Sequence, residues 1–130
     1  MKKLVIVLNL VCMFALGSFA QSMYGDAAKA DVKMKYVYSF EEALKRAKEE
    51  HKLIFFNCFA DWAIPCHSMN KLVFSDQEFA DWMDKHFVNL FIDVTSREGR
   101  PLAEKYRIRF QAHYLVLDEN GQIVHRIVGG

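Results

Sequence analysis

The chain has little excess charge of either sign, and it lacks the motifs of several common enzyme classes. Lysine and arginine number 17 against 16 aspartate and glutamate residues, so the formal net charge is only +1. No basic field is present that would attract nucleic acid or an anionic membrane surface. The sequence contains no phosphate-binding glycine loop, no zincin motif and no Ser/His/Asp grouping. We therefore expect no nucleic-acid partner, no cofactor and no resident metal.

Cysteine is scarce, with three among 130 residues. Cys12 lies in a segment typical of a secretory signal peptide, and we interpret it as an apolar residue that is removed. Two lysines precede an apolar run over residues 4–16, and residues 18–20 offer a small-residue cleavage site. The run is shorter than the roughly 18 residues that span a bilayer. We expect cleavage after residue 20, export to the periplasm or medium, and no membrane attachment afterwards.

The remaining 110 residues are enough for one small domain with a single core. We expect a loose lead-in with a possible edge strand over residues 21–37, followed by the main domain over residues 38–130. The continuous apolar run 53–59 predicts a strand covered on both faces, and Asn120-Gly121 predicts a hairpin turn. Further strands are expected at 33–38, 88–94, 114–117 and 123–128, with helices beginning at Ser39, near Pro65, at the Ser75–Glu78 capping box and at Pro101.

The most informative motif is Trp62-Ala63-Ile64-Pro65-Cys66, which resembles Trp-Cys-x-Pro-Cys with its first cysteine replaced by alanine. With the surrounding residues it resembles the secreted or periplasmic thioredoxin-like group of the thioredoxin fold. The resemblance implies an α/β fold with a central mixed sheet and helices on both faces. The other matching residues are Leu53–Asp61, Met69, Val73–Asp76, Phe87–Asn89, Asp93, Tyr106–Ile108 and Leu115–Gly121.

The family's last helix would begin where the sequence stops, at Gly129-Gly130. This C-terminal helix is therefore expected to be missing. Three explanations stay open: the sequence is truncated, a partner covers the open apolar face of the sheet, or the protein is unstable.

The departures from the family pattern fall on chemistry rather than on the core. The nucleophilic cysteine matches Ala63, the buried carboxylate matches Asn57, and the cis-proline matches Ala112. A cis peptide before a residue other than proline costs roughly 2.5–4 kcal/mol, so we expect a trans loop of different shape before Ala112.

Two main hypotheses follow. In the first, the protein has lost dithiol oxidoreductase activity and is a peptide-binding or chaperone-like module. In the second, it is a divergent thiol-disulfide oxidoreductase that works through Cys66 as its catalytic residue, with or without Cys58. A copper or zinc site at Cys66, His67 and His113 is a third alternative, without a metal-type spacing to support it. The expected binding residues for extended peptide or protein clients are Trp62, Ala63, Ile64, Pro65, Ala112 and His113.

Simpler structural interpretations accompany these hypotheses. Cys58 and Cys66 have the character of buried small hydrophobes. His67 is expected on the surface and His113 in a partly exposed loop. Helix-spaced core packing is expected for Met69, Phe74, Trp82 and Met83.

Overall fold

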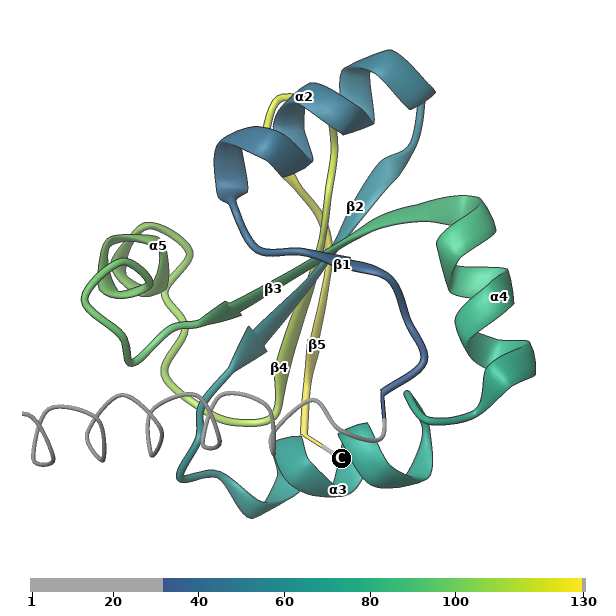
Figure 1. Cartoon of the computed structure of the whole chain (residues 1–130). Coiled ribbons are helices and arrows are strands. Elements are labelled where there is room, and N and C mark those ends of the chain that lie inside the picture. The colour runs from purple at the N-terminus through teal and green to yellow at the C-terminus, as the bar shows by residue number, and fades with distance from the viewer. Residues whose placement is uncertain (1–31, 130) are drawn as a thin grey trace, which may run out of the picture. The chain divides into compact units, whose positions relative to one another are not determined.

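The structure is a computed structural model that describes residues 32–129 (Figure 1). The expected signal peptide, Cys12 and most of the lead-in therefore lie outside the described residues. No helix within residues 32–129 is long and apolar enough to cross a membrane.

The described residues form a five-stranded mixed sheet with strand order β1-β3-β2-β4-β5. Strands β1 and β2 run parallel to β3, whereas β4 runs antiparallel to β2 and β5. This sheet confirms the predicted α/β fold, including the edge strand β1 and the β4–β5 hairpin. The strands are β1 (Tyr36–Val37), β2 (Leu53–Phe59), β3 (Phe87–Asp93), β4 (His113–Leu117) and β5 (Ile123–Val128).

Helices cover both faces of the sheet, as Figure 1 shows. One face carries α2 (Phe40–Glu50) and α5 (Arg100–Lys105), and the other carries α3 (Ile64–Leu72) and α4 (Gln77–His86). Because β2 is the middle strand between these layers, its side chains are buried on both sides from the second residue onward.

Side-chain caps fix where two helices begin. The Ser39 Oγ accepts a hydrogen bond from the Glu42 N–H at 3.3 Å, as the sequence predicts for α2. The capping residue of α4 is Asp76, whose Oδ1 accepts from the Phe79 N–H at 2.7 Å. The expectation that Ser75 caps α4 is therefore wrong, because the Ser75 hydroxyl donates to the carbonyl of Lys71 instead.

Two cores lie on opposite faces of β2. The core beneath α2 and α5 includes Phe56 and Cys58, both fully buried. On the other face, Phe55 stacks on Tyr114 with ring centroids 5.6 Å apart. Side chains that alternate along β2 therefore belong to different cores, which places Cys58 on the face away from α3.

The expected core packing of α4 is wrong for one residue. Met83 is buried as predicted, but Trp82 is 53% exposed. The Trp82 ring lies beside that of His86 on the helix surface, with centroids 4.4 Å apart.

The outer strand β5 leaves apolar side chains exposed. These are Ile123, Val124, Ile127 and Val128. A partner that covers this side of the sheet stays a prediction.

Candidate functional site

Ala63 occupies the N-cap of α3, where a thiol nucleophile would benefit from the helix N-terminus. Its backbone is extended, and its carbonyl accepts hydrogen bonds from the N–H groups of Cys66 at 3.1 Å and His67 at 3.4 Å. Pro65 lies in the first turn, where the missing N–H costs no helical hydrogen bond. The methyl side chain of Ala63 is buried and carries no reactive atom. The helix start is thus well formed but has no nucleophile at its cap.

Cys66 is the only thiol of this motif, and it points inward. The residue is 2% exposed, and its Sγ donates to the Gln111 Oε1 at 3.4 Å. Burial raises the pKa of the Cys66 thiol, a backbone hydrogen bond from Ala60 opposes this, and the Asp93 charge adds to the rise. A raised pKa lowers the fraction of the reactive thiolate at neutral pH.

The second cysteine is still less accessible. Cys58 is fully buried, and burial raises the pKa of its thiol well above the ordinary value. Both Cys58 and Cys66 are free thiols. The interpretation of both cysteines as buried side chains is therefore confirmed.

The loop opposite Cys66 contradicts one expectation from the sequence. The peptide bond between Gln111 and Ala112 is cis, so the predicted trans loop is wrong. Ala112 is fully buried, and its carbonyl accepts a hydrogen bond from the Gly129 N–H at 2.9 Å. Together with the Cys66–Gln111 contact, these neighbours surround the loop and hold it against α3.

His113 is also placed differently from the prediction. It is 2% exposed and is the first residue of β4 rather than part of an exposed loop. Its Nε2 accepts from Arg126 Nη1 at 2.7 Å, and its Nδ1 lies 3.3 Å from the Phe110 carbonyl. This assignment requires a neutral ring with the proton on Nδ1. Burial lowers the pKa of His113, the adjacent Arg126 charge lowers it further, and the Phe110 contact opposes both.

A hydrogen-bonded pair, buried Asn57 and half-buried Tyr36, replaces the carboxylate expected from the resemblance. Asn57 is buried, and its Nδ2 donates to the Tyr36 hydroxyl at 3.3 Å. Burial raises the pKa of Tyr36, whereas the hydrogen bond from Asn57 lowers it. Neither side chain titrates near neutral pH, so this pair offers no proton shuttle to Cys66.

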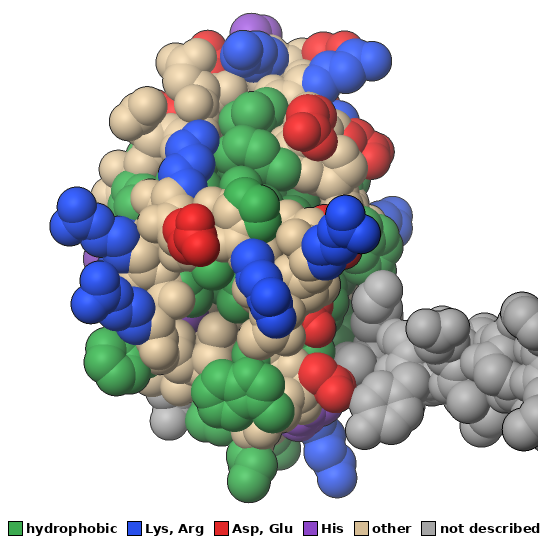
Figure 2. All heavy atoms as spheres, turned by 90° about the vertical axis from the view of Figure 1, so that its left-hand side faces the viewer, with side chains coloured by type: hydrophobic (Ala, Val, Ile, Leu, Met, Phe, Trp, Pro, Cys, Tyr) green, Lys and Arg blue, Asp and Glu red, His purple; other side chains and the backbone are tan. Residues whose placement is uncertain are grey.

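Above the buried groups, three apolar side chains are strongly exposed. Trp62 is 71% exposed, Ile64 is 78% exposed and Phe110 is 70% exposed. The Cys66–Gln111 hydrogen bond joins α3, which begins at Ile64, to the loop that carries Phe110. Figure 2 shows hydrophobic side chains gathered at the lower end of the molecule, on the face that carries α5. We call Trp62, Ile64 and Phe110 the apolar rim.

The family follows from a match between the sequence and a known family model. Residues 35–118 match the model described as Thioredoxin-like, a stretch that covers more than half of the chain. The chain belongs to the thioredoxin-like family.

Individual relatives agree with this assignment. The thioredoxin-like chain is 31% identical over 93 residues to thioredoxin H3 of Arabidopsis thaliana, covering 72% of this chain and 73% of that protein. It is 39% identical to a solved structure described as "a putative disulphide-isomerase from Bacteroides thetaiotaomicron", with a TM-score of 0.65, covering 76% and 81% of the two chains. A thioredoxin from Thermus thermophilus shares the fold at 24% identity and a TM-score of 0.66, covering 75% and 77%.

The thioredoxin-like fold brings most of the expected site residues together at one end of the sheet, but not all in the same role. Trp62 and Ile64 are exposed, whereas Ala63, Ala112 and His113 are buried. Pro65 is exposed in the first turn of α3. The buried three can therefore shape the surface but present little side chain to a ligand.

Phe110 was missed by the sequence reasoning. A single exposed phenylalanine carries no motif, and only the fold places it next to the loop that faces α3. Its place two residues before Ala112, the position that matches the family's cis-proline, is the sequence signal that could have identified it.

The proposed metal ligands do not form a group. Within the described part of the chain, no set of three histidine, cysteine or acidic side chains is arranged to hold a metal ion. The exposed His67 has its Nε2 at 2.6 Å from the Asp61 carbonyl, while His113 faces Arg126. The two imidazoles therefore have other partners.

Proposed function

We propose that this is an exported thioredoxin-like protein that lacks dithiol-disulfide exchange and binds extended segments of client proteins at the apolar rim. The observation that carries the proposal is Ala63 at the N-cap of α3. Dithiol reduction needs one thiolate to attack the substrate disulfide and a second thiolate to displace the resulting mixed disulfide. Ala63 has no sulfur for the first step.

Cys66 is a poor replacement for the missing nucleophile. It is buried, its pKa is raised, and its thiol donates to Gln111 rather than facing solvent. Cys58 lies in the core on the other face of the sheet, beneath α2 and α5. An exchange through these two sulfurs would require a change in the core packing.

The apolar rim supports binding of peptides. Large apolar side chains that remain exposed together often mark an interaction site. Trp62 and Phe110 are aromatic, and aromatic residues are common binding anchors. The hydrogen bonds made by Cys66 and by the Ala112 carbonyl fix the backbone segments from which the two aromatic side chains project.

The test combines two assays on the purified protein. We expect no catalytic reduction of insulin disulfides above the rate with reductant alone, for the protein and for Cys66→Ser. We also expect saturable binding of an extended peptide with an apolar anchor residue, monitored by fluorescence anisotropy. Catalytic turnover that Cys66→Ser abolishes would contradict the loss of activity, and an absence of peptide binding would contradict the binding function.

The second candidate is a divergent thiol-disulfide oxidoreductase that uses Cys66. It is favoured by the 39% identity to the protein described as a putative disulphide-isomerase. Intact mass under oxidising and reducing conditions separates the candidates. A reversible loss of two hydrogens within one chain supports a Cys58–Cys66 couple, and an unchanged mass supports the binding module.

A further inference from the structure

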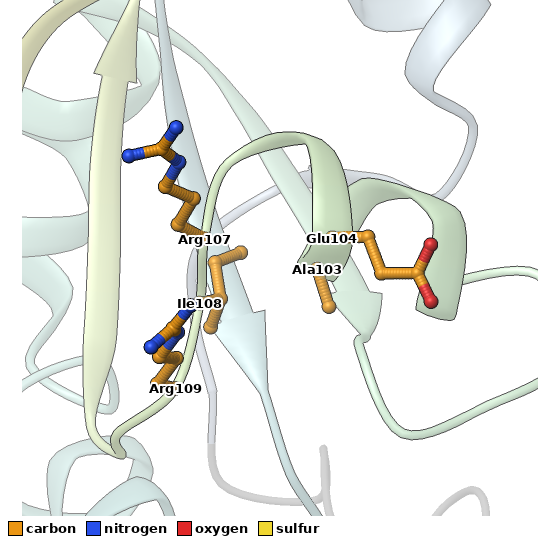
Figure 3. Close-up of a pocket in the computed structure, with 5 residues that line it drawn as sticks. All are labelled: Ala103, Glu104, Arg107, Ile108 and Arg109. Atoms are coloured by element: carbon orange, nitrogen blue, oxygen red, sulfur yellow. The ribbon is translucent and has the colours of Figure 1, made fainter.

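A basic hollow lies next to the apolar rim, between α5 and the segment that follows it. Figure 3 shows Ala103 and Glu104 on α5, and Arg107, Ile108 and Arg109 on the segment that follows the helix. The hollow has a volume of about 300 Å³. None of the residues that line it belongs to the Trp62–Cys66 motif at the start of α3.

Backbone hydrogen bonds fix the segment against α5. The Ile108 N–H donates to the Ala103 carbonyl at 2.9 Å, and the Arg107 N–H donates to the Glu104 carbonyl at 3.2 Å. These two bonds form a Schellman motif, in which a left-handed residue, usually glycine, ends the helix. Here Arg107 takes that position with a φ of 54°. The backbone of Arg107 is therefore fixed by the helix end, and its side chain is exposed.

Both arginines lack an ionic partner within the described residues. None of the ion pairs between described side chains includes Arg107 or Arg109, and both residues are exposed. In Figure 3, the Glu104 carboxylate points away from both guanidinium groups, and Ile108 turns toward Ala103. Ala103 and Ile108 thus give the hollow an apolar wall, and the two arginines line its edge with their guanidinium groups extending away from α5.

Charge is also separated along the chain in this region. Residues 97–109 carry five basic and two acidic side chains, a net charge of +3, and the rest of residues 32–129 carries −3. Figure 2 faces this part of the surface and shows arginine and lysine side chains spread around the hydrophobic ones, with acidic side chains among them. The excess of basic side chains in this segment would favour a negatively charged ligand beside it despite the near-neutral total.

The hollow and the rim are neighbours in the chain. Arg109 directly precedes Phe110, and an extended chain advances about 3.3–3.6 Å per residue. An extended peptide of six to eight residues is long enough to contact both. Planar guanidinium groups suit carboxylates because two parallel hydrogen bonds can form.

We propose that the clients bound at the apolar rim are acidic, with Asp or Glu side chains seated against Arg107 and Arg109. This inference rests on the proposed peptide-binding function and adds the chemical class of the client. The rim supplies the apolar anchor site, and the hollow selects for negative charge beside it.

The test uses eight-residue peptides that share one phenylalanine anchor and differ only in carrying two Glu or two Gln residues. We expect the Glu peptide to bind about tenfold more tightly at low salt, as two exposed charge pairs would allow, and less selectively at high salt. The preference should disappear in Arg107→Ala/Arg109→Ala. It should persist in Arg97→Ala/Arg100→Ala, which removes the same charge from exposed positions outside the hollow. Thermal unfolding of each variant checks that the fold is retained.

The outcomes distinguish this inference from the function on which it rests. Equal binding of Glu and Gln peptides, with both lost in Trp62→Ala, overturns the acidic preference and leaves the peptide-binding function standing. A preference that survives Arg107→Ala/Arg109→Ala, or that is lost equally in the control variant, also overturns the assignment to the hollow. If neither peptide binds, both proposals are overturned.

Discussion

Replacing Trp62 with alanine is expected to separate binding from folding. Trp62 is 71% exposed, so most of its surface is available to a ligand and little of it supports the folded state. A tryptophan has up to about 250 Å² of surface to bury, which leaves roughly 180 Å² for the client. At about 25 cal/mol per Å², full burial of that area has an upper limit of about 4.5 kcal/mol.

Costs of ordering the peptide and side chains reduce this limit. We expect Trp62→Ala to weaken peptide binding by about 2–4 kcal/mol, the range of interface hot spots. This corresponds to a rise in Kd of roughly 30- to 1000-fold. The free energy of unfolding should change by no more than about 0.5 kcal/mol, as is usual for exposed positions.

Trp82→Ala is the matched control, because Trp82 is 53% exposed but lies on α4 beside His86. The measurements are Kd by anisotropy with a labelled apolar-anchor peptide and unfolding by urea. The reasoning is refuted if Trp62→Ala binds as tightly as the unmodified protein, or if Trp82→Ala weakens binding equally.

Three further perturbations test the site. Ala63→Cys should introduce reduction of insulin disulfides, because it restores a thiol at the α3 N-cap. This activity should disappear when Cys66 is also changed to serine. An unchanged rate in Ala63→Cys would show that the loop cannot support disulfide exchange. His113 is neutral in the fold and its pKa is lowered, so the unfolded chain binds more protons as pH falls below about 6.5. Urea titrations should therefore show that the contribution of His113 to the free energy of unfolding is fully present above that pH and declines below it, by at most about 1.4 kcal/mol per pH unit for one proton. The same pH dependence in His113→Gln would contradict this. The Tyr114 hydroxyl is buried without a hydrogen-bond partner within the described residues. Tyr114→Phe should therefore leave the free energy of unfolding unchanged or raise it by up to about 1 kcal/mol. A clear loss of stability in urea would contradict this, because it would show that the hydroxyl makes a favourable contact.

The order of strands and helices was predictable because local patterns and long-range packing agree. The apolar run Leu53–Phe59 predicts a strand that is buried on both faces, and it forms β2 between two helical layers. Asn120-Gly121 predicts a tight connection, and Gly121 adopts a φ of 77° in that turn. In each case the residues that determine the element lie within it.

The site was only partly predictable because its key contacts join distant segments. The environment of His113 depends on Arg126, which reaches it from the neighbouring strand β5. The loop before Ala112 is held by Gly129 and by Cys66. Arg107 and Arg109 belong to no motif, and their common hollow exists only because α5 ends at Lys105 and the chain turns back along it.

The most direct test of the account is the rate of insulin disulfide reduction by the purified protein with a fixed supply of small-thiol reductant. The account predicts the rate of the reductant alone, because Ala63 offers no nucleophile at the start of α3. A rate that increases with protein concentration and is abolished by Cys66→Ser would contradict it.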